Sequence, residues 1–125
     1  MNSAKLIGIA PQLVVSDVKR TAEYYKEVLG FTIIGLVAEP PVYAMVERDG
    51  FQVHFAKSDT ADIPVNKDHR AISHDFIIWV PAIDDFFEEL VAKKARIIEG
   101  IVKRAYGSRE FVIEDCDGHR ILVGD

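Results

Sequence analysis

The sequence predicts an α+β protein made of two βαβββ repeats, whose curved mixed sheet surrounds a cleft and whose helices cover the outer face. Two observations support this fold class. The order of strand, helix and three strands occurs twice in 125 residues, and the hydrophobic pattern of the first copy returns in the second. This length suits one domain over residues 1–125. We place the first repeat at about 5–57, a linker at about 58–70 and the second repeat at about 71–125.

The first repeat opens with an apolar, β-branched segment at 6–15, which is typical of a strand. A helix follows, since Ser16 or Asp17 can accept a hydrogen bond from a free backbone N–H at its start. Gly30 ends it, because glycine readily takes the left-handed conformation of a helix cap. The apolar face of this helix comprises Val18, Ala22, Tyr25 and Leu29.

Three strands are predicted next, at 31–37, 42–48 and 51–57. Asp49-Gly50 separates the last two and is typical of a two-residue hairpin turn. Such a turn would pair Glu47, Met45 and Tyr43 with Gln52, His54 and Ala56.

The second repeat shows the same order. A strand is predicted at 74–80, a helix at 81–95 and three strands at 96–102, 109–115 and 119–125. The helix has acidic residues in its first turn and lysines in its last, as the helix dipole favours. Its predicted apolar side comprises Ile83, Phe87, Leu90 and Val91.

The two halves match at a shift of 65 residues along the helix and neighbouring strands, and at 68 in the final hairpin. The matched pairs are Val15 and Val80, Val18 and Ile83, Tyr25 and Leu90, Ile33 and Ile98, Gly35 and Gly100, and Asp49-Gly50 and Asp117-Gly118.

Composition narrows the function. The formal net charge of −5 disfavours nucleic acid as a partner, which usually requires a basic patch. The single cysteine, Cys116, rules out an intrachain disulfide and a cysteine-based zinc cluster, and it favours a reducing cytoplasm. The N-terminal segment reads neither as a signal peptide nor as a membrane span.

Alternation along the strands sorts side chains between the helix side and the cleft. In the first strand we expect Ile9, Leu13 and Val15 on the helix side. The candidate ligand-binding residues on the cleft side are Tyr43, Met45, Glu47, His54, Asp75, Trp79, Phe111 and Arg120. Trp79 would offer a stacking surface for a planar or cationic ligand, and Glu47 and Asp75 would offer negative charge. Ordinary core packing is the competing interpretation for the aromatic residues, and a solvated surface is the competing one for Glu47.

Three segments carry a resemblance to the vicinal-oxygen-chelate superfamily, which includes glyoxalase I, extradiol dioxygenases and bleomycin-resistance proteins. They are LVVSDVKRTAEYYKEVLGF, DGFQVHF and YGSREFVIEDCDGHRILVG. The resemblance implies metal ligands on the first and last strand of each half. Those positions are Ala10, His54, Asp75 and Leu122 here, and neither alanine nor leucine binds metal.

His54 and Asp75 therefore form the alternative metal site, which falls short of the about three protein ligands of a catalytic metal. Gln12, Glu47 or His74 would have to complete it. Otherwise His54 is a hydrogen-bonding group in the cleft, and Asp75 is its partner or ends a strand.

The chain looks most similar to the bleomycin-resistance branch, with Cys116 in place of the proline common there. This resemblance implies no cofactor and a metal-independent binder of a cationic or aromatic small molecule. It also implies a cytoplasmic homodimer, in some cases with exchanged N-terminal strands, and an antibiotic-resistance role by analogy alone. The alternatives are a divalent-metal-dependent lyase or dioxygenase that uses His54 and Asp75, and an assembly protein with a vestigial cleft.

Overall fold

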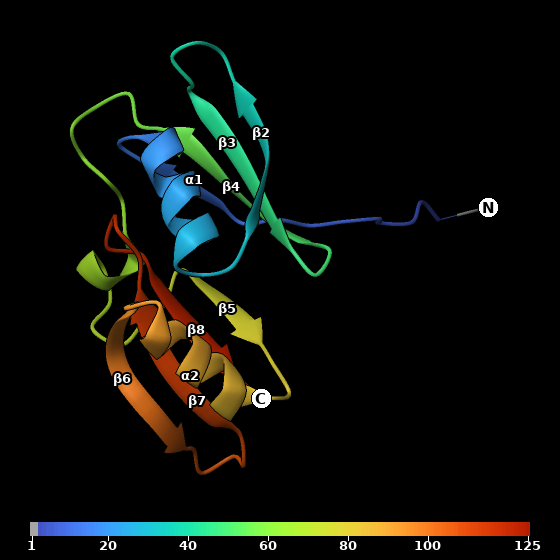
Figure 1. Cartoon of the computed structure of the whole chain (residues 1–125), viewed down its shortest axis with the longest axis vertical. Coiled ribbons are helices and arrows are strands. Elements are labelled where there is room, and N and C mark those ends of the chain that lie inside the picture. Colours follow the sequence, from blue (N-terminus) through green and yellow to red (C-terminus); the bar gives the residue numbers. More distant parts are fainter. Residues whose placement is uncertain (1–2) are drawn as a thin grey trace.

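The structure is a computed structural model that describes residues 3–125 (Figure 1). The first repeat contains β1 (Gln12–Val15), α1 (Val18–Glu27), β2 (Thr32–Val37), β3 (Tyr43–Arg48) and β4 (Phe51–Lys57). The second contains β5 (Phe76–Trp79), α2 (Ile83–Ala92), β6 (Arg96–Lys103), β7 (Arg109–Glu114) and β8 (Arg120–Gly124). A short 3-10 helix, η1 (Asn66–Asp68), lies in the connection between them.

The two repeats have the same topology, which confirms the predicted fold class. Their strand orders are β1-β4-β3-β2 and β5-β8-β7-β6, so each repeat forms its own four-stranded sheet. In both sheets the first strand runs parallel to the last, and the other pairs are antiparallel. Figure 1 shows α1 lying across the first sheet and α2 across the second. Each repeat thus contributes one mixed four-stranded sheet with a helix across it.

Helix α1 has the caps that the sequence predicts. The Asp17 side chain accepts a hydrogen bond from the Arg20 backbone N–H at 3.1 Å, and Gly30 follows the helix with φ of 77°. The predicted apolar face, which includes Val18, Ala22 and Tyr25, is buried. The two capping residues therefore set the length of the helix, and the apolar face sets its orientation on the sheet.

The hairpin between β3 and β4 has the predicted register, with Met45 opposite His54 and Arg48 opposite Phe51. Asp49 and Gly50 form its two-residue turn with φ of 53° and 86°. Both values lie in the left-handed region that such hairpin turns require.

One hydrophobic core runs through both repeats. In the first repeat the buried Tyr25 ring packs on Phe55 with centroids 4.7 Å apart. In the second, α2 buries Ile83, Phe86 and Leu90. Val91, which we expected to be buried, is exposed, because the side of α2 that faces the core is rotated toward Phe86.

The N-terminal segment departs from the prediction. Strand β1 begins at Gln12, and residues 3–11 have no regular structure. Leu6, Ile7 and Ile9 are 85%, 99% and 94% exposed, so the expectation that Ile9 packs under the helix is wrong. We call residues 3–11 the N-terminal arm; Figure 1 shows it extending away from both sheets, and its last residue, Pro11, accepts a 3.0 Å hydrogen bond from the His54 backbone N–H on β4.

The repeats also contact one another through polar groups in a pseudo-symmetric way, since the last hairpin of each meets the helix of the other. Arg48, which ends β3, donates hydrogen bonds of 2.8 and 3.1 Å to both carboxylate oxygens of Glu89 on α2. From the other side, Tyr25 on α1 donates a 2.7 Å bond to Asp115, in the loop after β7. These pairs hold the two helices against the opposite hairpins.

No helix within residues 3–125 combines the length and apolar character needed to cross a membrane.

Candidate functional site

Four strands contribute to the face of the first sheet that lies opposite α1, which we call the first concave face. Strand pairing sets its members, because residues directly opposite each other point to the same side. Gln12 pairs with His54, and His54 pairs with Met45, across β1, β4 and β3. The face comprises Gln12, Val14, Thr32, Gly35, Val37, Tyr43, Met45, Glu47, Gln52, His54 and Ala56.

A chain of three hydrogen bonds crosses this face. The Gln12 side-chain N–H donates to the Tyr43 hydroxyl at 3.0 Å, and that hydroxyl lies 2.7 Å from Nδ1 of His54. On the other side of the ring, Nε2 of His54 lies 2.8 Å from Oε1 of Gln52. We call these four side chains the polar chain. They come from three different strands, so the register of the sheet alone brings them together.

With the two glutamine amides oriented as in the structure, the polar chain defines the proton positions on His54. The Tyr43 oxygen accepts from Gln12, so its own hydrogen goes to Nδ1, which acts as an acceptor. Nε2 then carries the ring hydrogen and donates to the Gln52 carbonyl. Both nitrogens are engaged in this neutral state, and a metal would have to displace Tyr43 or Gln52 to bind the ring.

Met45 and Glu47 also lie on this face; Met45 packs over a glycine, and Glu47 accepts a backbone hydrogen bond. The methyl end of Met45 lies over Gly35, and a Cβ added there would come within 2.4 Å of it. The Glu47 carboxylate accepts a 2.9 Å hydrogen bond from the Gly50 backbone N–H. It therefore braces the hairpin turn through one of its two oxygens.

Trp79, Asp75 and Arg120 lie on the corresponding face of the second sheet, the second concave face. Ile77 pairs with Leu122, the same relation that joins Gln12 and His54 in the first sheet. Trp79 pairs with Gly124 at the edge of this sheet and is 70% exposed. The ring is thus open to contact from outside the chain.

Asp75 is held by the backbone. Its two oxygens accept hydrogen bonds from the N–H groups of Asn66, at 3.0 Å, and Arg120, at 2.9 Å. These bonds tie the inter-repeat connection to the start of β8. The guanidinium of Arg120 lies 3.4 Å from Glu114 rather than at Asp75. The geometry matches the interpretation of Asp75 as a strand-end group.

Phe111 faces the opposite way from the sequence-based expectation. Val112 pairs with Leu122 on the concave face, so alternation sends Phe111 to the helix side. Its ring is fully buried, with the rings of Phe86 and Phe87 at 6.3 and 5.0 Å between centroids. The cause is the loop at 115–119 between β7 and β8, whose length the sequence did not define.

A charged cluster occupies the second concave face near the β6–β7 turn. Glu110 accepts hydrogen bonds from Arg104 at 2.9 Å and from the Tyr106 hydroxyl at 2.7 Å. Burial alone would raise the pKa of Glu110, but the bonds from Tyr106 and Arg104 outweigh it and hold that pKa below its ordinary value. Arg104 also pairs with Glu99, so the charges of this cluster are satisfied within the chain.

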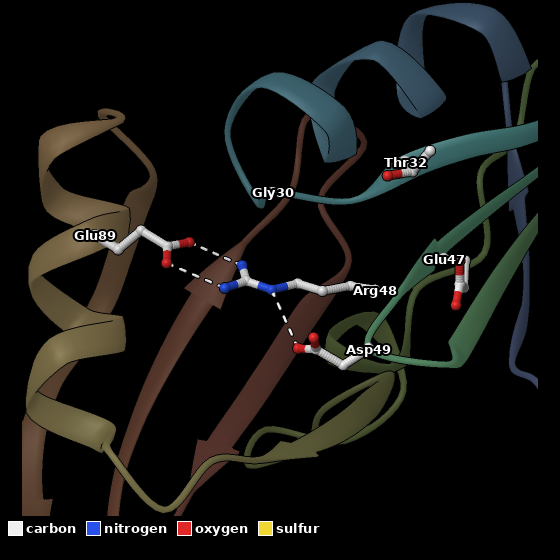
Figure 2. A pocket seen from close by; sticks show the side chains of 6 residues that line it. All are labelled: Gly30, Thr32, Glu47, Arg48, Asp49 and Glu89. Carbon is white, nitrogen blue, oxygen red and sulfur yellow. Dashed lines mark hydrogen bonds and ion pairs between the residues drawn. The ribbon is translucent and has the colours of Figure 1, made fainter.

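Figure 2 shows a hollow between the repeats at the β3–β4 turn. Arg48 crosses it to Glu89, and its guanidinium also donates to the Leu29 carbonyl at 2.8 Å. The bond from Arg48 lowers the pKa of Glu89. The charges here belong to the contact between the repeats. The hollow is lined by Gly30, Thr32, Glu47, Arg48, Asp49 and Glu89.

Residues 3–125 contain no group of three or more His, Cys, Asp or Glu side chains arranged to hold a metal ion. His54 and Asp75 lie in different sheets, and the structure does not bring Glu47 or His74 together with them.

The fold and this site define a class of protein, namely paired βαβββ modules with hydrogen-bonding concave faces. The family model described as "Glyoxalase/Bleomycin resistance protein/Dioxygenase superfamily" matches residues 8–123. The chain belongs to this superfamily.

Solved structures agree on the fold. A glyoxalase-related enzyme from Clostridium phytofermentans has a TM-score of 0.77 at 17% identity, with 99% of this chain and 98% of that one covered. The bleomycin-binding protein of Streptomyces verticillus, complexed with copper(II)-bleomycin, scores 0.73 at 20% identity, covering 97% of each chain. A virulence protein from Salmonella typhimurium is 26% identical, with a TM-score of 0.67 and 98% of both chains covered. No curated protein sequence matches.

Of the predicted residues, the structure gathers Tyr43, Met45 and His54 on one face and places Asp75, Trp79 and Arg120 on the other sheet. The sequence reasoning considered Gln12 only as a possible further metal ligand and did not single out Gln52 as a site residue. A signal was available, because they are the two glutamines of the whole chain and both have cleft-side parity.

Proposed function

We propose that this chain is a metal-independent small-molecule binding protein of the bleomycin-resistance type, which holds an aromatic or cationic ligand in a cleft between two subunits. The engagement of His54 is the observation that carries the proposal. Both ring nitrogens are used within the polar chain, so the residue at the family's metal position acts as a hydrogen-bonding group.

Exposed apolar groups support a cleft completed by a second copy. The two concave faces belong to separate sheets, and Trp79 and Ile77 are 70% and 44% exposed on the second. The N-terminal arm adds further exposed apolar side chains and extends away from its own sheets (Figure 1). Apolar surface of this kind marks contact with a partner or ligand. A partner's sheet and arm would cover both.

Fluorescence and calorimetry test the binding function. Trp79 is the single tryptophan, so its emission reports on one position. We expect metal-free bleomycin to change that emission saturably, and His54→Ala to weaken binding severalfold because Tyr43 and Gln52 lose their shared partner. Calorimetry on Trp79→Phe checks that the optical change reflects binding. Absence of saturable heat and emission change for bleomycin contradicts the bleomycin-type ligand.

Metal analysis tests the alternative of a metal-dependent lyase or dioxygenase. Protein purified without chelator is expected to carry no stoichiometric divalent ion. A stoichiometric ion that disappears in His54→Ala and Asp75→Ala would overturn the proposal in favour of the enzyme.

A further inference from the structure

The first concave face carries one carboxylate and no lysine or arginine side chain. The carboxylate is that of Glu47, which lies opposite Gln52 and accepts a hydrogen bond from the Gly50 N–H at the turn. The remaining polar side chains, apart from Thr32, form the polar chain. An anionic ligand group would lose its hydration against this face without meeting an opposite charge, which is costly, and a cationic group would meet one only at Glu47. Away from Glu47 the face therefore suits a neutral polar group.

The polar chain has a direction. Every hydrogen in it points from Gln12 toward Gln52, through Tyr43 and His54. Within residues 3–125, Oε1 of Gln12 and Nε2 of Gln52 make no hydrogen bond. One end of the chain thus presents an acceptor and the other end presents a donor.

The polar chain still presents one donor and one acceptor when the direction of its hydrogen bonds is reversed. If both glutamine amides rotate by half a turn and the imidazole hydrogen moves to Nδ1, each bond is kept in the opposite sense. Gln52 then presents the acceptor and Gln12 the donor. Hydrogen bonds in such a chain polarise one another, so the two ends respond together. In either sense the pair complements a group with one acceptor and one donor.

From this we infer that the polar chain is a recognition element for a neutral amide-type group, such as a carboxamide, lactam or urea, on the ligand. The inference rests on the proposed function, since it assigns part of the same ligand-binding site. It adds the chemistry of the group that meets the first sheet, whatever charge the rest of the ligand carries. Gln12 and Gln52 become specificity-determining residues, and His54 and Tyr43 set their orientation.

Four probes of nearly the same shape test this chemistry: benzamide, benzamidinium, benzoate and acetophenone. Only benzamide offers an uncharged donor and acceptor together. The side-chain amide signals of Gln12 and Gln52 are followed by NMR in protein labelled on glutamine, which yields two NH2 groups in all. We expect benzamide to shift both signals and to bind about three- to tenfold more tightly than the other three, as one neutral hydrogen bond is worth.

Variants sharpen the test. We expect Gln52→Leu and Gln12→Leu each to weaken the binding of benzamide about three- to tenfold. Gln52→Glu replaces the donor by acceptors and should reverse the preference between benzamide and benzamidinium. Thr32→Val removes a polar group from the same face outside the polar chain and should leave the ranking unchanged. All three positions are exposed, so the fold should tolerate these changes.

The outcomes separate the two hypotheses. Probe binding that changes Trp79 emission but moves neither glutamine signal, or equal affinity for benzoate and benzamide, overturns the inference and leaves the proposed pocket standing. Glutamine shifts with the expected ranking but no Trp79 response support the inference and count against a shared cleft. Failure of every probe to move either glutamine signal up to its solubility limit overturns the inference.

Discussion

Tyr25 is buried in the core of the first repeat, yet its hydroxyl belongs to a polar network in the second. It donates to Asp115 at 2.7 Å, and the Asp115 carboxylate also accepts from the backbone N–H groups of Asp117 and His119. The His119 ring lies beside it, with Nδ1 3.3 Å from the carboxylate. Asp115 and His119 are 4% and 1% exposed, so a lost partner in this network cannot be replaced easily by water.

Tyr25→Phe is expected to lower the free energy of unfolding by about 2 kcal/mol at neutral pH, because it removes a hydrogen bond to a buried carboxylate. Burial alone would raise the pKa of Asp115, but the adjacent His119 ring and the hydrogen bonds from Tyr25 and the backbone outweigh it and lower that pKa. Such a group stabilises the fold above its ordinary pKa of about 3.9 and loses this contribution as pH falls toward the folded value. The difference in the free energy of unfolding between wild type and Tyr25→Phe should therefore become smaller in acid.

Urea unfolding at several pH values measures both effects. Tyr24→Phe is the matched control, since Tyr24 is the neighbouring half-buried residue and donates to no carboxylate among the described residues. A Tyr25→Phe loss no larger than that of the control, or a gap that widens below pH 4, would refute the assigned role.

The sequence could place Tyr25 but not its partner. Helical spacing identified the buried face of α1, which the structure confirms. The partner Asp115 is 90 residues away and belongs to no hydrophobic period, so no pattern joins the two. The predicted orientation of Phe111 was wrong for a related reason. Which side chains of β7 face the helix depends on the length of the β7–β8 loop, which local residues do not define.

At the scale of elements, the α1–β2 connection shows why a glycine stands where the two repeats meet. Gly30 has φ of 77°, and a Cβ built on it would lie 2.6 Å from Nη1 of Arg48. Arg48 holds that place through its two bonds to Glu89 (Figure 2). Its guanidinium also lies 5.0 Å from the centroid of the Phe86 ring. Gly30 thus allows both the left-handed backbone conformation and the close approach of the Arg48 side chain.

Gly30→Ala should destabilise the protein more than Gly50→Ala does. Gly50 also has a positive φ, of 86°, but nothing lies within 4 Å of its added Cβ. A left-handed alanine costs about 1 kcal/mol at either position. At Gly30 we expect roughly 1 kcal/mol more, a modest amount because the Arg48 pair is half-exposed and partly screened by solvent.

Thermal and urea unfolding of both variants check this difference. In an Arg48→Met background the flexible methionine can move aside, so Gly30→Ala should destabilise the protein no more than Gly50→Ala does. Equal losses for the two alanine variants in the wild-type background would show that Arg48 exerts no such constraint.

Element prediction succeeded where turns and caps are local. Asp17, Gly30 and the Asp49-Gly50 turn act as the sequence indicated. The bulges could not be seen in advance: β2 shifts register between Ile33 and Gly35, and β6 between Ile97 and Glu99. The matching positions are therefore Ile33 and Ile97, one residue away from the Ile33 and Ile98 that sequence alignment of the repeats gave.

At the scale of the whole molecule, the repeat predicted the architecture but not how its halves meet. Hydrophobic periodicity identifies which face of each helix is buried, and this was enough for the topology. The contacts between the halves are polar pairs such as Arg48 with Glu89, for which sequence spacing has no signal. The same limit applies to the site, whose members are brought together by strand register across β1, β3 and β4.

The last prediction concerns dimerisation through the N-terminal arm. We expect the wild type to sediment as a dimer, and Ile7→Glu with Ile9→Glu to raise the dissociation constant more than tenfold, since each buried isoleucine is worth about 1.5–3 kcal/mol. Ile72→Glu is the matched control, because Ile72 is 78% exposed but lies outside the arm. Sedimentation velocity over a concentration series, with circular dichroism to verify folding, measures the effect. A wild type that stays monomeric, or a double variant that dimerises as well as Ile72→Glu, would show that the arm does not join two copies, and the cleft would then have to form within one chain.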